Sequence, residues 1–303
     1  MSATVYFSGG TVITREAVVI SAGFLKAPDA ATSRIYLKFG TFWAAHDVPN
    51  DFIVSVTFSA VLGRLFALGK NGLIKYVGES NQPFTYENVR GRFQECRLHS
   101  GKERGSTSSI RAIGSQVFVC GWGGQIYRLA GGQWDDFNEG IPNAKRNDFL
   151  DLDGGSVDDV YVVGMNWTVY HRDDRSWRRI DFPSNAHLYS VRYVSPEEVF
   201  IAGSNGALFR GFKDTWDFVG QEEIKGNFWC LEKFREDIYV THANAEIFRL
   251  ADNRLLEVDV GLTPKPTTNK LNANDGVLWS FGPYDLLEYD GAIWRSVICP
   301  DNE

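Results

Sequence analysis

The sequence has few sulfur-containing residues and no long apolar segment. Among its 303 residues are two methionines and four cysteines, and no run approaches the about 18 apolar residues that a membrane span needs. The N-terminal residues Met1 to Phe7 lack the basic start and apolar core of a signal peptide. We therefore expect a cytoplasmic protein, although delivery without a cleaved signal stays open.

Metal-binding and catalytic motifs are also lacking. The cysteines are Cys96, Cys120, Cys230 and Cys299, and none forms a CxxC pair. Disulfides are not expected in the cytoplasm, and Cys120 ends an apolar run, which predicts a buried free thiol. No nucleophile elbow, kinase signature or complete phosphate loop is found. We expect no metal, no cofactor and no enzymatic activity.

Positive charge is in the minority. The chain carries 31 Lys and Arg against 38 Asp and Glu, which gives a formal net charge of −7. Nucleic-acid binding usually requires a basic surface that neutralises phosphates. Anionic membranes repel an acidic chain for the same reason. We therefore expect neither direct nucleic-acid binding nor membrane binding.

Aromatic residues and glycine are abundant by contrast. Aromatics make up 14% of the chain, and there are 30 glycines. Rings and β-branched residues pack well on pleated sheets, and glycine suits the tight turns between short strands. This composition disfavours a large helical protein and indicates an all-β fold.

A short apolar segment recurs along the chain. The copies are Val117–Gly121, Val160–Gly164, Val199–Gly203, Ile238–His242 and a weaker Val277–Phe281. Their last residues are spaced 43, 39, 39 and 39 residues apart. Thirteen residues after these ends lie Trp134, Trp177, Trp216, Leu255 and Trp294. The fixed offset indicates a structural repeat, and we expect these large side chains to wedge between neighbouring units.

The clearest copy predicts four strands, at 188–194, 198–202, 207–212 and 215–219. A four-stranded antiparallel unit every 40–45 residues is typical of propeller blades. An earlier copy at Leu65–Gly69 and strand-like runs in the first 50 residues extend the count. We predict an all-β single-domain propeller over residues 1–303 with seven four-stranded blades, six being the alternative. We expect a loop insertion at 90–109, and closure by N- and C-terminal strands in one sheet.

The repeat also resembles known families. The segment from Gly121 to Trp134 reads GxxGxIYR followed by GxW, and it resembles WD40/YVTN/BNR-like propeller repeats, including those of photosystem assembly factors. The resemblance covers roughly residues 55–298 and implies the propeller architecture. It departs from the sialidase Asp-box, because the residues five before the tryptophans are Leu129, Arg172, Gly211 and Tyr289.

The predicted turns carry aromatic and polar residues that we expect to be exposed. In a propeller, the turns between second and third strands share a face with the loops that join the blades, and such loops often carry function. Exposed rings favour a partner surface. The candidate partner-binding residues of these turns are Trp122, Trp167, Asn205, His242, Asn244, Tyr284 and Asp285. The alternative is that the rings pack between blades and the asparagines stabilise turns.

Charge is unevenly distributed along the chain. The stretch 135–159 holds eight acids against Lys145 and Arg146, a net charge of −6. The acids are Asp135, Asp136, Glu139, Asp148, Asp151, Asp153, Asp158 and Asp159. This predicts an acidic patch that attracts a basic partner, with Asp148, Asp151 and Asp153 as candidate contacts. An ordinary solvated surface is the alternative.

These observations favour a non-enzymatic, protein-binding propeller that is a monomer on its own. A small acidic single-propeller chain resembles bacterial immunity proteins that neutralise toxins. The resemblance implies a protein partner such as a basic nuclease toxin. A carbohydrate-binding or glycosidase-type propeller and an assembly factor for a larger complex are the alternatives.

Overall fold

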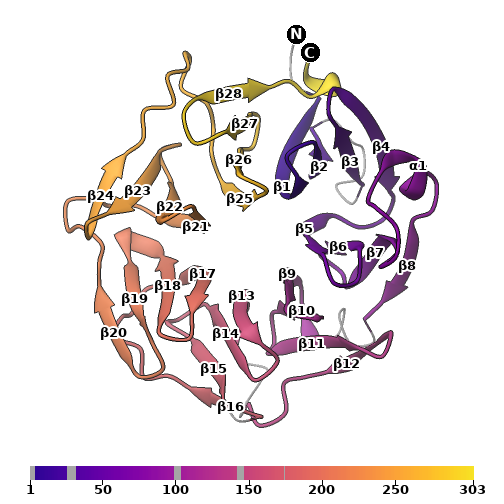
Figure 1. Ribbon diagram of the computed structural model, residues 1–303. Helices are drawn as coiled ribbons and strands as arrows, with labels where there is room; N and C mark the ends of the chain where they lie inside the picture. Colours follow the sequence, from indigo (N-terminus) through magenta and orange to yellow (C-terminus); the bar gives the residue numbers. More distant parts are fainter. Residues whose placement is uncertain (1–3, 26–31, 99–103, 142–146, 174) are drawn as a thin grey trace.

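The computed structural model describes residues 4–25, 32–98, 104–141, 147–173 and 175–303. Seven four-stranded antiparallel sheets are arranged as blades around a ring, with the first strand of each blade innermost (Figure 1). The predicted seven-bladed propeller is therefore confirmed, and the six-bladed alternative is wrong. No described helix is both long and apolar enough to cross a bilayer.

The blades follow one another in chain order. Blade 1 contains β1 (Val5–Thr14), β2 (Ala17–Phe24), β3 (Ser33–Phe39) and β4 (Phe42–Val48). Blade 2 contains β5 (Ile53–Ser59), β6 (Arg64–Gly69), β7 (Leu73–Gly78), the short helix α1 (Tyr86–Val89) and β8 (Gln94–Arg97). Blade 3 contains β9 (Thr107–Ile113), β10 (Gln116–Gly121), β11 (Gln125–Ala130) and β12 (Gln133–Asp136). Blade 4 contains β13 (Phe149–Ser156), β14 (Asp159–Gly164), β15 (Val169–Asp173) and β16 (Ser176–Arg179).

The last three blades have the same plan. Blade 5 contains β17 (Leu188–Ser195), β18 (Glu198–Gly203), the 3-10 turn η2 (Ser204–Gly206), β19 (Leu208–Phe212) and β20 (Thr215–Phe218). Blade 6 contains β21 (Phe228–Phe234), β22 (Asp237–His242), β23 (Ile247–Ala251) and β24 (Arg254–Glu257). Blade 7 contains β25 (Lys270–Asn274), β26 (Val277–Phe281), β27 (Leu286–Tyr289) and β28 (Trp294–Val297), and the 3-10 turn η3 (Pro300–Asn302) follows. The strands predicted for 188–219 agree with blade 5.

The glycine that ends the second strand has a steric cause. A Cβ added to Gly164 would lie 2.1 Å from the carbonyl oxygen of Asp148, in the segment that leads into blade 4. In blade 7 the same crowding occurs at Gly282, whose Cβ would lie 2.0 Å from the oxygen of Thr267. The expected equivalence of Phe281 with these glycines is therefore one residue out of register.

The repeated tryptophans pack between blades, as predicted. Trp216 of blade 5 lies edge-on to Tyr161 of blade 4, with ring centroids 6.1 Å apart. Trp177 is buried, and its indole nitrogen donates a hydrogen bond to the carbonyl of Phe137 at 2.7 Å. Burying such rings between sheets contributes much of the propeller's stability, because each aromatic side chain removes a large apolar area from water.

The ring is closed by the N- and C-terminal blades, but not within one sheet. Strands β1–β4 and β25–β28 form separate sheets that pack face to face. After β28, the side chain of Asn302 accepts the backbone amides of Thr4 and Val5 at 3.0 and 3.1 Å and donates to the carbonyl of Val5 at 3.2 Å. The termini therefore lie together (Figure 1), and the predicted shared closing sheet is wrong.

The expected insertion at 90–109 begins earlier in the chain. Strand β8 and the start of β9 fall within that range, and 99–103 lies outside the described residues. The additional length joins β7 to β8 over residues 79–93 and includes α1. Tyr86 of this connection lies edge-on to Phe42 of β4, with ring centroids 4.7 Å apart, and Phe93 stacks on His46 of β4 at 4.3 Å. The connection thus ties blade 2 to the outer edge of blade 1.

Candidate partner-binding face

The turns between second and third strands lie against the segments that join the blades. Met165 donates its backbone amide to the carbonyl of Asp148 at 2.9 Å, and Ser204 donates to that of His187 at 2.8 Å. Equivalent bonds run from Lys70 to Phe52, from Trp122 to Ser106 and from Ala243 to Asn227. These bonds place the turns and the joining segments on one face, as expected, and we call it the turn face.

Three of the predicted aromatic residues are exposed on the turn face. The exposed fractions are 45% for Trp122, 43% for Trp167 and 51% for Tyr284. None of the three rings belongs to a hydrophobic cluster between blades. The alternative that these rings pack between blades therefore does not hold. Large rings left in water favour a partner that covers them.

The predicted asparagines are exposed at turn positions. Asn205 has φ +57°, and Asn244 lies in the turn of blade 6. Asparagine adopts positive φ more readily than most residues, so the backbone explains Asn205. Both side chains still face solvent and stay candidate contacts.

His242 lies inside the protein rather than on its surface. The ring is 2% exposed, and its two nitrogens lie 2.6 Å from Glu246 Oε2 and 2.6 Å from the carbonyl oxygen of Lys225. His242 thereby joins the turn of blade 6 to the segment 219–227. With both ring nitrogens engaged, His242 is not available to a partner and is not part of the exposed turn face.

Two of the predicted acids hold turn-face segments together. Asp285 accepts the backbone amide and the hydroxyl of Thr267, at 2.8 and 2.7 Å. Asp148 accepts the amide of Gly123 at 3.1 Å. Both carboxylates are half-buried, so they position the turns beside Tyr284 and Trp122 and keep part of their surface open.

Asp151 and Asp153 lie on the inner strand β13 and are buried. Asp151 accepts the amide of Val191 at 3.1 Å, and Asp153 accepts that of Tyr193 at 2.9 Å. An inner strand has one edge without a hydrogen-bonded neighbour, so its amides need side-chain acceptors. These two aspartates serve that need between blades 4 and 5. Because they are buried, they are not part of the exposed turn face either.

The same inner strands carry alternating charges. Arg111 of β9 lies 3.6 Å from Asp151, and Arg192 of β17 lies 3.3 Å from Asp153 and also pairs with Glu232 of β21. Burial raises the pKa of Glu232 against the opposing pull of the two arginines. Each of these three carboxylates is paired with one of the two arginines inside the ring, so none of them is open to a partner.

The predicted acidic patch over 135–159 is not one surface. Besides the two buried aspartates, Asp158 and Asp159 lie at the start of β14, opposite the turn face, near Arg172 and His171. Asp135, Asp136 and Glu139 are exposed at and after the end of β12, and other acids are exposed on the turn face. Exposed carboxylates there are Asp181, Glu222 and Glu223, in the segments that join blades 4, 5 and 6. Within the described residues, none of these three forms an ion pair or a side-chain hydrogen bond.

The sequence reasoning missed two aromatic residues, Tyr189 and Trp229, which lie at bulges of the inner strands. Six first strands contain a one-residue bulge near the turn face, at Ser8, Val54, Ser108, Leu150, Tyr189 and Trp229. A bulge leaves one residue unpaired and redirects its side chain. The first four of these residues line a central cavity of about 90 Å³. The sequence signal for Tyr189 and Trp229 is a one-residue break in the alternation of apolar and polar residues along the first strand.

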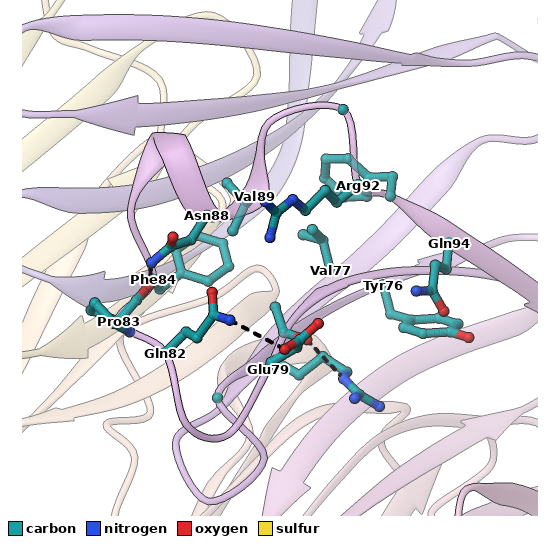
Figure 2. A pocket seen from close by; sticks show the side chains of 15 residues that line it. Tyr76, Val77, Glu79, Gln82, Pro83, Phe84, Asn88, Val89, Arg92 and Gln94 are labelled. Atoms are coloured by element: carbon teal, nitrogen blue, oxygen red, sulfur yellow. Dashed lines mark hydrogen bonds between the residues drawn. The ribbon is translucent and has the colours of Figure 1, made fainter.

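A separate pocket lies away from the turn face. It has a volume of about 400 Å³ and lies between β7, β8 and the connection 79–93 (Figure 2). Arg64, Arg92 and Glu79 line it, and Gln82 donates a hydrogen bond to Glu79 Oε2 at 3.4 Å. The lining mixes both signs of charge. Across the described residues, no group of three His, Cys, Asp or Glu side chains is arranged to hold a metal ion.

The fold is that of a seven-bladed β-propeller, and its turn face carries exposed aromatic rings. Solved structures of the same fold include a virginiamycin B lyase from Staphylococcus aureus, with a TM-score of 0.77 and 12% identity over 98% of this chain and 96% of that chain. The WD40 propeller domain of Doa1 gives a TM-score of 0.72 and 12% identity over 95% and 93%. YCF48 bound to D1 peptide gives 0.70 and 13% over 95% and 94%.

In sequence, the chain is similar to the immune protein Tsi7 of Pseudomonas aeruginosa. The two are 27% identical over 216 residues, which cover 68% of this chain and 70% of that protein. No protein-family model matches the sequence.

Proposed function

We propose that this propeller is a bacterial immunity protein that binds and blocks a toxin through its turn face. The observation that carries the proposal is the similarity to Tsi7, which extends over about two thirds of each chain. The exposed rings of Trp122, Trp167 and Tyr284 support it, because they offer large apolar contact area on one face of a rigid ring.

The partner in this proposal is a basic toxin domain, such as a nuclease. Such a domain carries positive charge where it contacts phosphates, and Asp181, Glu222 and Glu223 offer complementary charge on the turn face. The immunity protein acts as a cytoplasmic monomer before it meets the toxin. It blocks the toxin by covering its surface, without catalysis.

The direct test is co-purification from the source organism. An affinity-tagged chain is isolated with its bound proteins, and the complex is sized and identified by mass spectrometry. We expect a stoichiometric complex with one protein whose expression alone arrests growth and whose effect the chain suppresses. If the chain elutes alone and protects cells from no toxin encoded beside it, the proposal fails. A glycan array gives the contrasting outcome, since a carbohydrate-binding propeller binds sugars there without a protein partner.

A further inference from the structure

The largest bulge residues form a pair of rings on neighbouring blades. Tyr189 of β17 and Trp229 of β21 occupy the same bulge position in blades 5 and 6, and their ring centroids are 4.9 Å apart at an interplanar angle of 36°. Both side chains are half-buried, and neither belongs to a hydrophobic cluster between blades. The packing of the blades therefore does not require either ring.

Acidic side chains lie on the same sector of the turn face. Asp181 lies in the segment that leads to Tyr189, and Glu222 and Glu223 lie in the segment that leads to Trp229. These three carboxylates are exposed and unpaired within the described residues. The exposed bases nearby are Lys225 and Arg179, which ends β16 beside Asp181, so three acids face two bases there. This sector, between blades 4 and 6, is therefore locally negative.

No cationic side chain of the described residues lies over either of the two rings. Arginine and lysine groups of the described chain make eight contacts over aromatic rings, but none lies over Tyr189 or Trp229. An aromatic face attracts a cation through its quadrupole, and nearby carboxylates strengthen the attraction. Lys270, on β25 of the neighbouring blade 7, lines the central cavity, so a cation is favoured beside the two rings on the turn face rather than deeper in the ring.

We propose that the toxin docks a loop with an arginine or lysine side chain over the Tyr189–Trp229 pair, between the carboxylates of blades 4 to 6. This inference rests on the proposed immunity function and names the contact that anchors it. The aromatic pair supplies stacking area, and Asp181, Glu222 and Glu223 supply charge. Trp122 and Trp167 then contact the toxin further along the same face.

Site-specific photo-cross-linking in living source cells tests this arrangement whatever the identity of the toxin. The full-length chain is prepared with Trp229→p-benzoylphenylalanine, and a matched chain carries the same cross-linker at Val61, which is exposed on the opposite face. We expect the first chain alone to cross-link one protein, at a peptide that contains arginine or lysine. A cross-linked peptide without a basic residue overturns the proposal.

The outcomes separate this inference from the immunity function itself. A third chain carries the cross-linker at Trp167. Cross-links at position 167 without any at 229 overturn the anchor and leave the immunity function standing. No cross-link at either position, together with growth arrest that the chain does not suppress, overturns both.

Binding of the protein so identified is then measured by titration. We expect Trp229→Ala to weaken binding by about 30-fold or more, the range of an interface hot spot, and Trp229→Phe to retain most of the affinity. Replacing both Glu222→Gln and Glu223→Gln is expected to reduce the salt dependence of binding. Unchanged affinity in a Trp229→Ala chain with unchanged melting temperature overturns the anchor.

Discussion

The carboxylate of Asp151 accepts a hydrogen bond from the backbone amide of Val191, which lies one blade further around the ring, at 3.1 Å. The same carboxylate group accepts the hydroxyl of Ser109 from the preceding blade at 2.8 Å. One aspartate therefore joins the inner strands of three blades. Equivalent bonds run from the amide of Ile110 to Ser55 and from the amide of Leu231 to Ser190. Side chains of the inner strands thus replace the hydrogen bonds that a neighbouring strand would supply.

The first prediction concerns this connection. We expect Asp151→Ala to lower the free energy of unfolding by about 2–4 kcal/mol, because it removes one of the two carboxylates beside Arg111 and leaves the buried amide of Val191 without its acceptor. Denaturant unfolding measures the change. The exposed Glu139→Ala variant is the control, with an expected effect within about 0.5 kcal/mol. Equal stabilities for the two variants would contradict this role of Asp151.

The second prediction concerns the exposed rings. Trp122→Ala and Trp167→Ala are each expected to weaken toxin binding by about 1–2 kcal/mol, since tryptophans at interfaces are often hot spots. Neither change is expected to shift the melting temperature, because both rings lie outside the inter-blade clusters. Calorimetric titration and thermal unfolding measure the two effects. Val61→Ala on the opposite face is expected to leave binding unchanged, and a loss of binding there would argue against the turn face.

The third prediction concerns ring closure. Asn302→Ala removes three hydrogen bonds to the backbone of Thr4 and Val5. At about 0.5–1.5 kcal/mol for each bond, and with the bonds partly exposed, we expect a loss of about 1–3 kcal/mol. Hydrogen exchange of the amides in β1 is expected to accelerate in the same variant. Unchanged exchange in β1 would show that the blades close the ring without this residue.

The fourth prediction concerns pH. Burial raises the pKa of Asp159, but hydrogen bonds from His171 and Tyr193, at 2.8 and 2.7 Å, outweigh it and hold the pKa below its usual value. A depressed folded-state pKa stabilises the protein above the unfolded-state value of about 3.9, and the contribution disappears as the pH falls through the folded-state pKa.

Asp159→Asn tests this contribution. Unfolding by urea is measured for both chains between pH 3 and pH 7. The variant is expected to be less stable than the parent chain near pH 7, and the difference is expected to shrink as the pH falls below about 4. A difference that stays constant over the whole range would assign the loss to packing rather than to the carboxylate.

Much of the fold was predictable because it depends on local patterns. The strands of blade 5 follow from alternation between glycine and asparagine turns, and the offset to Trp216 follows from the length of one hairpin. Six copies of that pattern could be counted, and the strand-like runs of the first 50 residues predicted a seventh blade, with six blades as the alternative. The exposure of Trp122 and Trp167 was also predictable, since both occupy tight turns.

Which acids are exposed and which are buried was not predictable in the same way. Asp148, Asp151 and Asp153 are close in sequence, and the local excess of acids favoured a patch. Alternate residues of a strand point to opposite sides. In β13, Asp151 and Asp153 form ion pairs with Arg111 and Arg192 of the neighbouring inner strands. Whether an acid is exposed depends on blades that lie about 40 residues away in the chain.

The sequence by itself determined the all-β propeller, its repeat and its aromatic turns, because these features are written in short segments. Only the tertiary structure decided how the ring closes, which acids are buried, and that Tyr189 and Trp229 meet on neighbouring blades. The physical reason is that closure, burial and bulge direction depend on contacts between blades, and a repeat pattern within one blade does not specify its neighbours.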